Sequence, residues 1–192
     1  MQRIFVVHFE DSQDALNRVA SLCRRRLFTV DSLTVGRTET PGVSRMTMVV
    51  DTDRDRARQL EANLYKLVNV LRVEDVTDRP AVCRDLAMIK VAAPADARAD
   101  IMQLVQVFRA RVVDVAADSL VIETTGTEDK VDRLLQVLRP FGVMEMVRTG
   151  RVAMCRGSQA SGSEDHVGPL TDEAASSNQP ESQPSGPCPH SR

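Results

Sequence analysis

Cysteine and histidine are the side chains best suited to bind metals or act as nucleophiles, and this chain uses both sparingly. Its 192 residues include four cysteines and three histidines. The cysteines lie far apart, without the C-x-x-C spacing typical of a zinc site or a redox pair. Only His8 lies outside the polar C-terminal stretch, and one histidine is too few for a metal centre or for a Ser/His/Asp or Cys/His set. We therefore expect no metal site, and reduced thiols at Cys23, Cys83, Cys155 and Cys188.

Carboxylates are abundant, but their spacing is typical of helix caps, turns and solvated faces rather than of a general acid and base. The sequence contains no glycine-rich loop or Walker sequence that would cradle phosphates. These patterns predict that the chain has no catalytic residues and holds no cofactor of its own.

The charge balance and the scarcity of aromatic residues argue against nucleic-acid binding. The 25 basic and 27 acidic residues leave the chain nearly neutral, and Tyr65 is its only tyrosine beside five scattered phenylalanines and no tryptophan. A surface on which single-stranded bases could stack is therefore not expected. No apolar run approaches the ~20 residues of a membrane span, and the N-terminus lacks the order of a signal peptide. We expect a cytoplasmic protein that binds neither nucleic acid nor membrane.

The spacing of apolar residues predicts the order strand, helix, strand, strand, helix, strand. The clearest part is a hairpin, 31–39 and 44–50, in which apolar and polar residues alternate on either side of a Pro-Gly turn. The remaining elements are helices expected at 15–26 and 54–66 and strands expected at 3–10 and 68–76. The apolar face of the first helix is expected to carry Leu16, Val19, Ala20 and Cys23.

The same order of elements is expected a second time, from residue 85 to residue 148. It opens with a strand at 85–93, whose apolar centre is Met88, Ile89 and Val91. Two helices are expected, one beginning at Pro94 and one capped by Thr127 that ends before Pro140. The other strands of this copy are expected at 112–115, 120–124 and 143–148.

Two such copies predict an α+β fold of two ferredoxin-like βαββαβ sandwiches, at 1–78 and 79–157. A domain of roughly 75 residues buries only about 60% of its unfolded surface, so association would add stability. The second and fourth strands of this fold are edges with unpaired backbone groups. We therefore expect a homodimer in which the first domains join sheets or pack helices side by side. Residues 158–192 are rich in Ser, Pro and Gly and predict a disordered tail.

Four segments, in order, give the chain a family resemblance that covers about residues 2–157. They are the hairpin and the stretches 64–73, 108–115 and 148–154. Together they resemble the small, regulatory subunit of acetolactate synthase, the thiamine-dependent enzyme that begins branched-chain amino-acid synthesis. The resemblance implies that 1–78 is an ACT domain and 79–157 the C-terminal domain of the small subunit. It also implies a separate catalytic subunit that carries thiamine diphosphate, Mg and FAD and is activated by this chain, with feedback by valine.

The resemblance further places an amino-acid effector site between the first strand and the first helix. There the backbone N–H groups of a helix N-terminus can hold a ligand carboxylate. The second strand of the partner copy completes the site across the dimer interface. The residues that match are Asp11, Ser12, Gln13, Asp14, Ala15 and Leu16, with Thr29 and Val30 from across the interface.

Three of these positions depart from the family pattern: glycine is usual at Asp14, asparagine at Thr29, and asparagine is frequent at Asp11. The Asp14 carboxylate would repel the carboxylate of a bound amino acid. Two like charges about 4 Å apart cost about 4 kcal/mol at an effective dielectric near 20, which is roughly a thousandfold in affinity. Alternatively, Asp14 caps the helix and occupies the amides that a ligand would use. Thr29 offers one hydroxyl in place of an amide. Each interpretation predicts weakened valine binding, unless the altered pocket prefers another small amino acid.

Two other functions remain open from the residues. One is a free-standing ACT-domain amino-acid sensor that acts on another enzyme or on transcription, and the other is an adaptor without a ligand. Binding to a catalytic subunit would separate the regulatory subunit from both.

Overall fold

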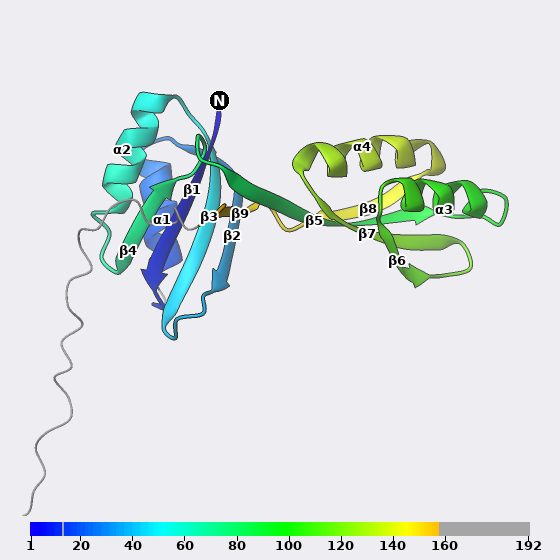
Figure 1. Cartoon of the computed structure of the whole chain (residues 1–192), viewed down its shortest axis with the longest axis horizontal. Helices are drawn as coiled ribbons and strands as arrows, with labels where there is room; N and C mark the ends of the chain where they lie inside the picture. The colour runs from blue at the N-terminus through cyan, green and yellow to red at the C-terminus, as the bar shows by residue number, and fades with distance from the viewer. Residues whose placement is uncertain (13, 158–192) are drawn as a thin grey trace, which may run out of the picture. The chain divides into compact units, whose positions relative to one another are not determined.

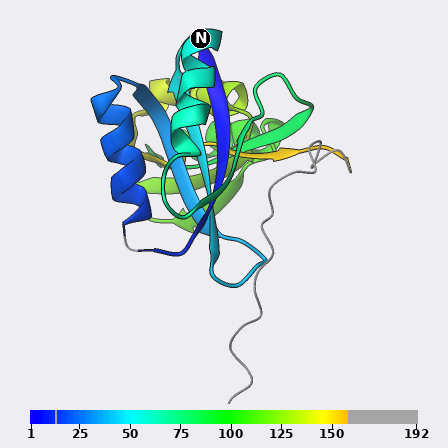
Figure 2. The same ribbon diagram turned by 90° about the vertical axis from the view of Figure 1, so that its left-hand side faces the viewer.

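The first half of the chain folds into a four-stranded antiparallel sheet with two helices on one face (Figures 1 and 2). The structure, a computed structural model, describes residues 1–12 and 14–157, which belong to one compact unit. Gln13 and the expected tail, 158–192, lie outside the described residues. The strands lie in the order β2-β3-β1-β4, so β2 and β4 are its edges. In chain order the elements are β1 (Gln2–Glu10), α1 (Ala15–Arg25), β2 (Thr29–Arg37), β3 (Val43–Asp51), α2 (Arg54–Leu64) and β4 (Val70–Asp75).

The second half repeats this topology and adds one strand. Its main sheet has the order β6-β7-β5-β8, and β9 pairs with the beginning of β5. Both α3 and α4 cover one face of the sheet (Figure 1). The elements are β5 (Ala81–Ala92), α3 (Arg98–Val107), β6 (Arg111–Val115), β7 (Ser119–Gly126), α4 (Glu128–Leu138), η1 (Arg139–Phe141), β8 (Val143–Arg148) and β9 (Val152–Cys155). The predicted fold class, two ferredoxin-like α+β sandwiches, is confirmed.

Each sandwich has an apolar core between its sheet and its helices. In the first, alternate residues of β1 point toward α1 and α2, because successive side chains of a strand face opposite ways. These core residues of β1 are Phe5, Val7 and Phe9. The second core is built in the same way around Ile89 and Val91 of β5.

The apolar face of α1 lies slightly away from its predicted position. Val19 and Cys23 are buried as expected, but Leu16 is 45% exposed and Ala20 is also exposed. Ala15 and Leu22 are buried in their place, because they too lie at helical spacing from Val19 and Cys23. Helical spacing alone allows both faces, and packing against the sheet selects one.

The structure refines or corrects several predicted details of the second copy. Met88 is 40% exposed, because it lies on the opposite side of β5 from Ile89 and Val91. The helix expected at Pro94 begins only at Arg98, after a turn. Thr127 occupies the N-cap position of α4, but its side chain makes no capping hydrogen bond.

Two strands also have unexpected bounds. β4 begins only at Val70, because Asn69 has a φ of 75°, which interrupts extended backbone. β5 is longer than expected, and β9 was not predicted at all. The first four residues of β5 pair with β9, from Ala81 opposite Cys155 to Arg84 opposite Val152.

β9 contributes to a third apolar cluster, on the face of the first sheet opposite its helices. The cluster joins Val6 of β1 to Val76 and to Ala153 of β9, with Ile4, Cys83 and Cys155 packed around them. Arg45 of β3 adds a polar tie, since its guanidinium donates a 2.5 Å hydrogen bond to the carbonyl of Ala153. The C-terminal part of the described chain therefore packs against the N-terminal sheet.

Candidate functional site

The loop before α1, where the effector site is expected, is attached to the β2–β3 hairpin. The backbone N–H of Asp11 donates a 2.8 Å hydrogen bond to the carbonyl of Gly42. The Asp11 carboxylate accepts a hydrogen bond from the Ser44 hydroxyl of β3. Asp11 is therefore engaged within the protein, and its side chain is not held ready for a ligand.

Asp14 lies at the N-cap position of α1 and is exposed. Within the residues that the structure describes, its carboxylate accepts no capping hydrogen bond from the first turn. The alternative in which Asp14 caps the helix therefore lacks its contact in this structure. Asp53, at the start of α2, shows the contrast, because its carboxylate accepts a 2.8 Å hydrogen bond from the N–H of Arg56.

The remaining candidate residues lie in two separate places. Ala15 is buried and Leu16 is exposed at the beginning of α1, whereas Thr29 and Val30 are exposed at the beginning of β2. Thr29 pairs with Asp51, and Asp51 pairs with Gln2, so Thr29 lies at the Gln2 end of the sheet. The loop at Asp11 follows the other end of β1, eight residue steps or roughly 27 Å away. A site that uses both groups requires two copies of the chain.

The edge strand β2 and the helix beside it carry exposed apolar side chains. Such residues on an unpaired edge invite another chain. They are Leu16 and Leu27 at the two ends of α1 and Val30, Leu33 and Val35 on β2.

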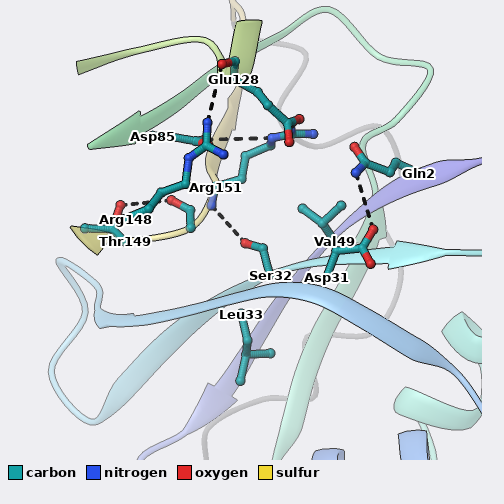
Figure 3. A pocket seen from close by; sticks show the side chains of 11 residues that line it. Gln2, Asp31, Ser32, Leu33, Val49, Asp85, Glu128, Arg148, Thr149 and Arg151 are labelled. Atoms are coloured by element: carbon teal, nitrogen blue, oxygen red, sulfur yellow. Dashed lines mark hydrogen bonds and ion pairs between the residues drawn. The ribbon is translucent and has the colours of Figure 1, made fainter. Parts of the chain in front are cut away.

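A concave site lies beside β2, where the connection between β8 and β9 passes the first sheet (Figure 3). This junction pocket has a volume of about 370 Å³. Ser32 and Leu33 contribute to it from β2, and Asp85, Arg148 and Arg151 contribute from the second half of the chain. Figure 3 shows the Arg151 side chain between Asp85 and Glu128, with its backbone near Ser32.

The charges of the junction pocket are paired with one another. Arg148 Nε lies 3.2 Å from one carboxylate oxygen of Asp85, and Arg151 Nε lies 3.9 Å from the other. The Arg151 guanidinium also pairs with Glu128, and the Arg148 guanidinium lies 3.2 Å from a carboxylate oxygen of Asp132. Asp85 is only 4% exposed. Burial raises the pKa of Asp85, and the two arginines oppose that rise. An anionic ligand would have to displace these carboxylates, so the pocket is built as an internal contact.

Comparison with known proteins identifies both halves of the chain. Residues 7–72 match the sequence profile of the AHAS small subunit-like ACT domain. Residues 84–157 match the profile of the small subunit of acetolactate synthase. The chain is 44% identical over 159 residues to the probable acetolactate synthase small subunit of Archaeoglobus fulgidus, covering 83% of this chain and 99% of the relative. The chain belongs to the acetolactate synthase small-subunit family.

Other members of this family give the same result. The small subunit of Bacillus subtilis is 40% identical over 164 residues, covering 85% of this chain and 95% of that protein. The crystal structure of the acetolactate synthase small subunit from Thermotoga maritima matches with a TM-score of 0.76 and 36% identity, covering 82% of this chain and 98% of that one. The predicted resemblance is confirmed, and with it a regulatory-subunit family of branched-chain amino-acid biosynthesis.

The charged residues of the junction pocket were not predicted as site residues from the sequence. One signal was available, because Asp85 lies two residues before Ala87 and therefore on the same side of β5 as Ile89. A carboxylate in phase with a buried stripe predicts a buried partner of opposite charge. Of the partners, Arg148 ends the strand expected at 143–148, and Arg151 lies in the stretch 148–154 that supported the family resemblance.

Two kinds of feature are absent from the described part of this small-subunit chain. Residues 1–12 and 14–157 contain no group of three or more His, Cys, Asp or Glu side chains that could hold a metal ion. In the same part of the chain, every helix is too short or too polar to cross a bilayer.

Proposed function

We propose that this chain is the non-catalytic regulatory subunit that binds and activates the thiamine-dependent catalytic subunit of acetolactate synthase in the cytoplasm. The observation that carries the proposal is the match of both halves, in order, over 99% of the length of the Archaeoglobus relative. Thiamine diphosphate, Mg and FAD would then belong to the catalytic partner. The division at 78/79 into an ACT domain and a C-terminal domain is part of the same proposal.

The proposed assembly is a homodimer that joins two chains through β2. Support comes from the position of β2 at the edge of its sheet and from its exposed Val30, Leu33 and Val35. Antiparallel pairing of two such edges would bring Thr29 of one chain toward the α1 N-terminus of the other. The two separated groups of candidate residues could then form one effector site.

The proposed effector is a small amino acid, and Asp14 and Thr29 weaken the response to valine. The exposed Asp14 carboxylate lies at the helix N-terminus that would hold the ligand carboxylate, with no capping hydrogen bond to neutralise part of its charge. Thr29 lies at the start of the edge strand, where an amide would offer donors and an acceptor together.

Association and activation test the central proposal. The full chain, mixed with the acetolactate synthase catalytic subunit of the same organism, should co-purify with it and raise the rate of pyruvate condensation. Failure to associate, or an equal rate without this chain, would contradict the proposal and favour the free-standing sensor.

Calorimetry tests the effector response. The unmodified chain should bind valine weakly, and the double variant Asp14→Gly with Thr29→Asn should recover micromolar binding, a gain of up to about a thousandfold. Asp14→Asn with Thr29→Asn is the matched control, since it removes the charge but keeps the bulk. Micromolar binding by the unmodified chain would refute the weakened response.

A further inference from the structure

Three residues between β8 and β9, Thr149, Gly150 and Arg151, lie directly against β2. The Arg151 backbone N–H donates a 2.9 Å hydrogen bond to the Ser32 hydroxyl. The Thr34 hydroxyl donates a 3.2 Å hydrogen bond to the Thr149 carbonyl. Ser32 and Thr34 are two residues apart, so one face of β2 holds both ends of this segment.

Gly150 allows the close approach between these two hydrogen bonds. Its φ is +88°, a conformation that residues with a Cβ rarely adopt. A Cβ at this position would lie 2.6 Å from Ser32 Oγ and 3.0 Å from Thr34 Oγ1. The chain therefore needs glycine here for two independent reasons, its backbone conformation and its contact with β2.

The same three residues are also fixed to the second half of the chain. Thr149 pairs with Leu86 of β5, since its N–H donates to the Leu86 carbonyl at 3.0 Å and its hydroxyl accepts from the Leu86 N–H at 3.2 Å. The Arg151 guanidinium pairs with Glu128, the first residue of α4, and faces the buried Asp85 (Figure 3). The segment thus holds β2 through short polar contacts and the C-terminal sandwich through strand pairing and ion pairs.

We infer that Thr149–Gly150–Arg151 is a coupling segment that links the position of β2 to the position of the β5–α4 region. This inference rests on the proposed function for its regulatory meaning, because Thr29 and Val30, the proposed effector contacts, precede Ser32 on the same strand. The pairing of β2 with β3 is irregular between Val30 and Ser32. A ligand that changes this irregular stretch would shift Ser32 and, through Arg151, the start of α4.

The buried charges make the coupling stiff. Moving Arg151 away is costly, because it pairs with Glu128 and lies 3.9 Å from the buried Asp85, so both carboxylates would lose a partner. A displacement of β2 is therefore passed on to α4 instead of being absorbed at the contact. By linkage, if the effector changes the affinity of the C-terminal sandwich for a partner by some factor, that partner changes the affinity for the effector by the same factor.

Amide hydrogen exchange of the full chain tests the coupling without effector or catalytic subunit. The double variant Ser32→Ala with Thr34→Val removes both hydrogen bonds and adds no heavy atom to either side chain. Exchange should become about tenfold faster in 149–155 and also in the first turn of α4, as expected for the loss of two weak hydrogen bonds. Faster exchange confined to 149–155, with α4 unchanged, would overturn the inference.

Two controls separate coupling from general destabilisation. Thr38→Val changes a threonine whose hydroxyl contacts only the local β2–β3 turn, and it should leave α4 unchanged. Gly150→Ala should accelerate exchange in both β2 and α4. Gly142→Ala introduces the same kind of strain at φ +85°, but the nearest atom is Ala92 Cβ at 3.6 Å, so β2 should not respond. A response of β2 to Gly142→Ala equal to that of Gly150→Ala would contradict the inference.

A second arm uses the catalytic subunit. The Ser32→Ala/Thr34→Val chain should still co-purify with the catalytic subunit. The valine response is compared in two chains, one with Asp14→Gly/Thr29→Asn alone and one with all four changes. Valine at millimolar concentration should change the rate of pyruvate condensation less in the chain with four changes. If the unmodified chain does not activate at all, the proposed function fails while the exchange result still stands. If activation is intact but α4 does not respond in exchange, only the coupling fails.

Discussion

The two sandwiches have the same strand order, but within the described residues, 1–12 and 14–157, the second face of only one sheet is covered. In the first, Val6 and Val49 face away from the helices and are each only 1% exposed. In the second, Met88 and Val147 face away from the helices and are 40% and 50% exposed. Since the topology is shared, the difference comes from the added strand, because Ala153 of β9 closes the cluster around Val6. Burial in this fold is decided by the strand added after the repeat as much as by the repeat itself.

The largest effect is expected when the same charge is placed on the helix-free face of each sheet. Val6→Asp should lower the free energy of unfolding by about 4 kcal/mol, because it buries a carboxylate without a partner. Met88→Asp should change it by no more than about 0.5 kcal/mol, since the new charge remains in water. Urea denaturation of each full-length variant measures both values. Equal midpoints for the two variants would show that the faces do not differ.

A smaller effect is expected when the two edge strands are compared. Val35 on β2 and Val113 on β6 are 39% and 50% exposed on equivalent edges. Val35→Lys should convert the proposed dimer to monomer at micromolar concentration, because a lysine on the edge opposes strand pairing. Val113→Lys should leave the dimer intact. Sedimentation velocity distinguishes these outcomes, and dissociation by the β6 variant alone would place the interface in the second sandwich.

The smallest expected effect is a pH dependence of opposite sign in the two sandwiches. The pKa of His8, on the first sheet, is lowered from 6.5 by burial and by the charges of Arg45 and Arg72. As the pH falls, His8 is therefore protonated in the unfolded chain before it is protonated in the folded chain. The stability that neutral His8 contributes is present above pH 6.5 and is lost as the pH falls through the folded pKa. The pKa of Asp85 is raised from 3.8, so stability is fully present below pH 3.8 and is lost as the pH rises through the folded pKa.

Two variants isolate these signs in urea titrations at a series of pH values. The stability of the unmodified chain relative to His8→Gln should rise with pH, and its stability relative to Asp85→Asn should fall, each by at most about 1.4 kcal/mol per pH unit. Slopes of the same sign would mean that the two arginines determine the direction of the Asp85 pKa shift, and burial does not.

Local patterns were enough to predict the repeated fold, and they failed where a contact joins distant segments. The hairpin and the helices were predictable because their spacing is set within a few residues. The shift from Leu16 to Ala15 at the start of α1 was not, since both satisfy helical spacing and only the sheet selects between them. β9 was missed because Val152–Cys155 is short and is extended by its pairing with β5.

The candidate site divides in the same way. The resemblance indicated the loop at Asp11 and the strand start at Thr29, but no local pattern reveals that one chain holds them at opposite ends of a sheet. The contact between Ser32 and Arg151 joins residues 119 positions apart. The requirement for glycine at position 150 comes in part from the contact with Ser32, which only the folded chain brings near.

The closure of the first sheet by β9 also sets the order of events during translation. The core between the sheet and its helices can form once β4 has left the ribosome, because all of its residues precede Asp75. The cluster around Val6 must wait for Ala153, which emerges on the order of ten seconds later at ordinary rates of synthesis. During that interval the nascent sheet presents an apolar surface that the finished chain no longer shows.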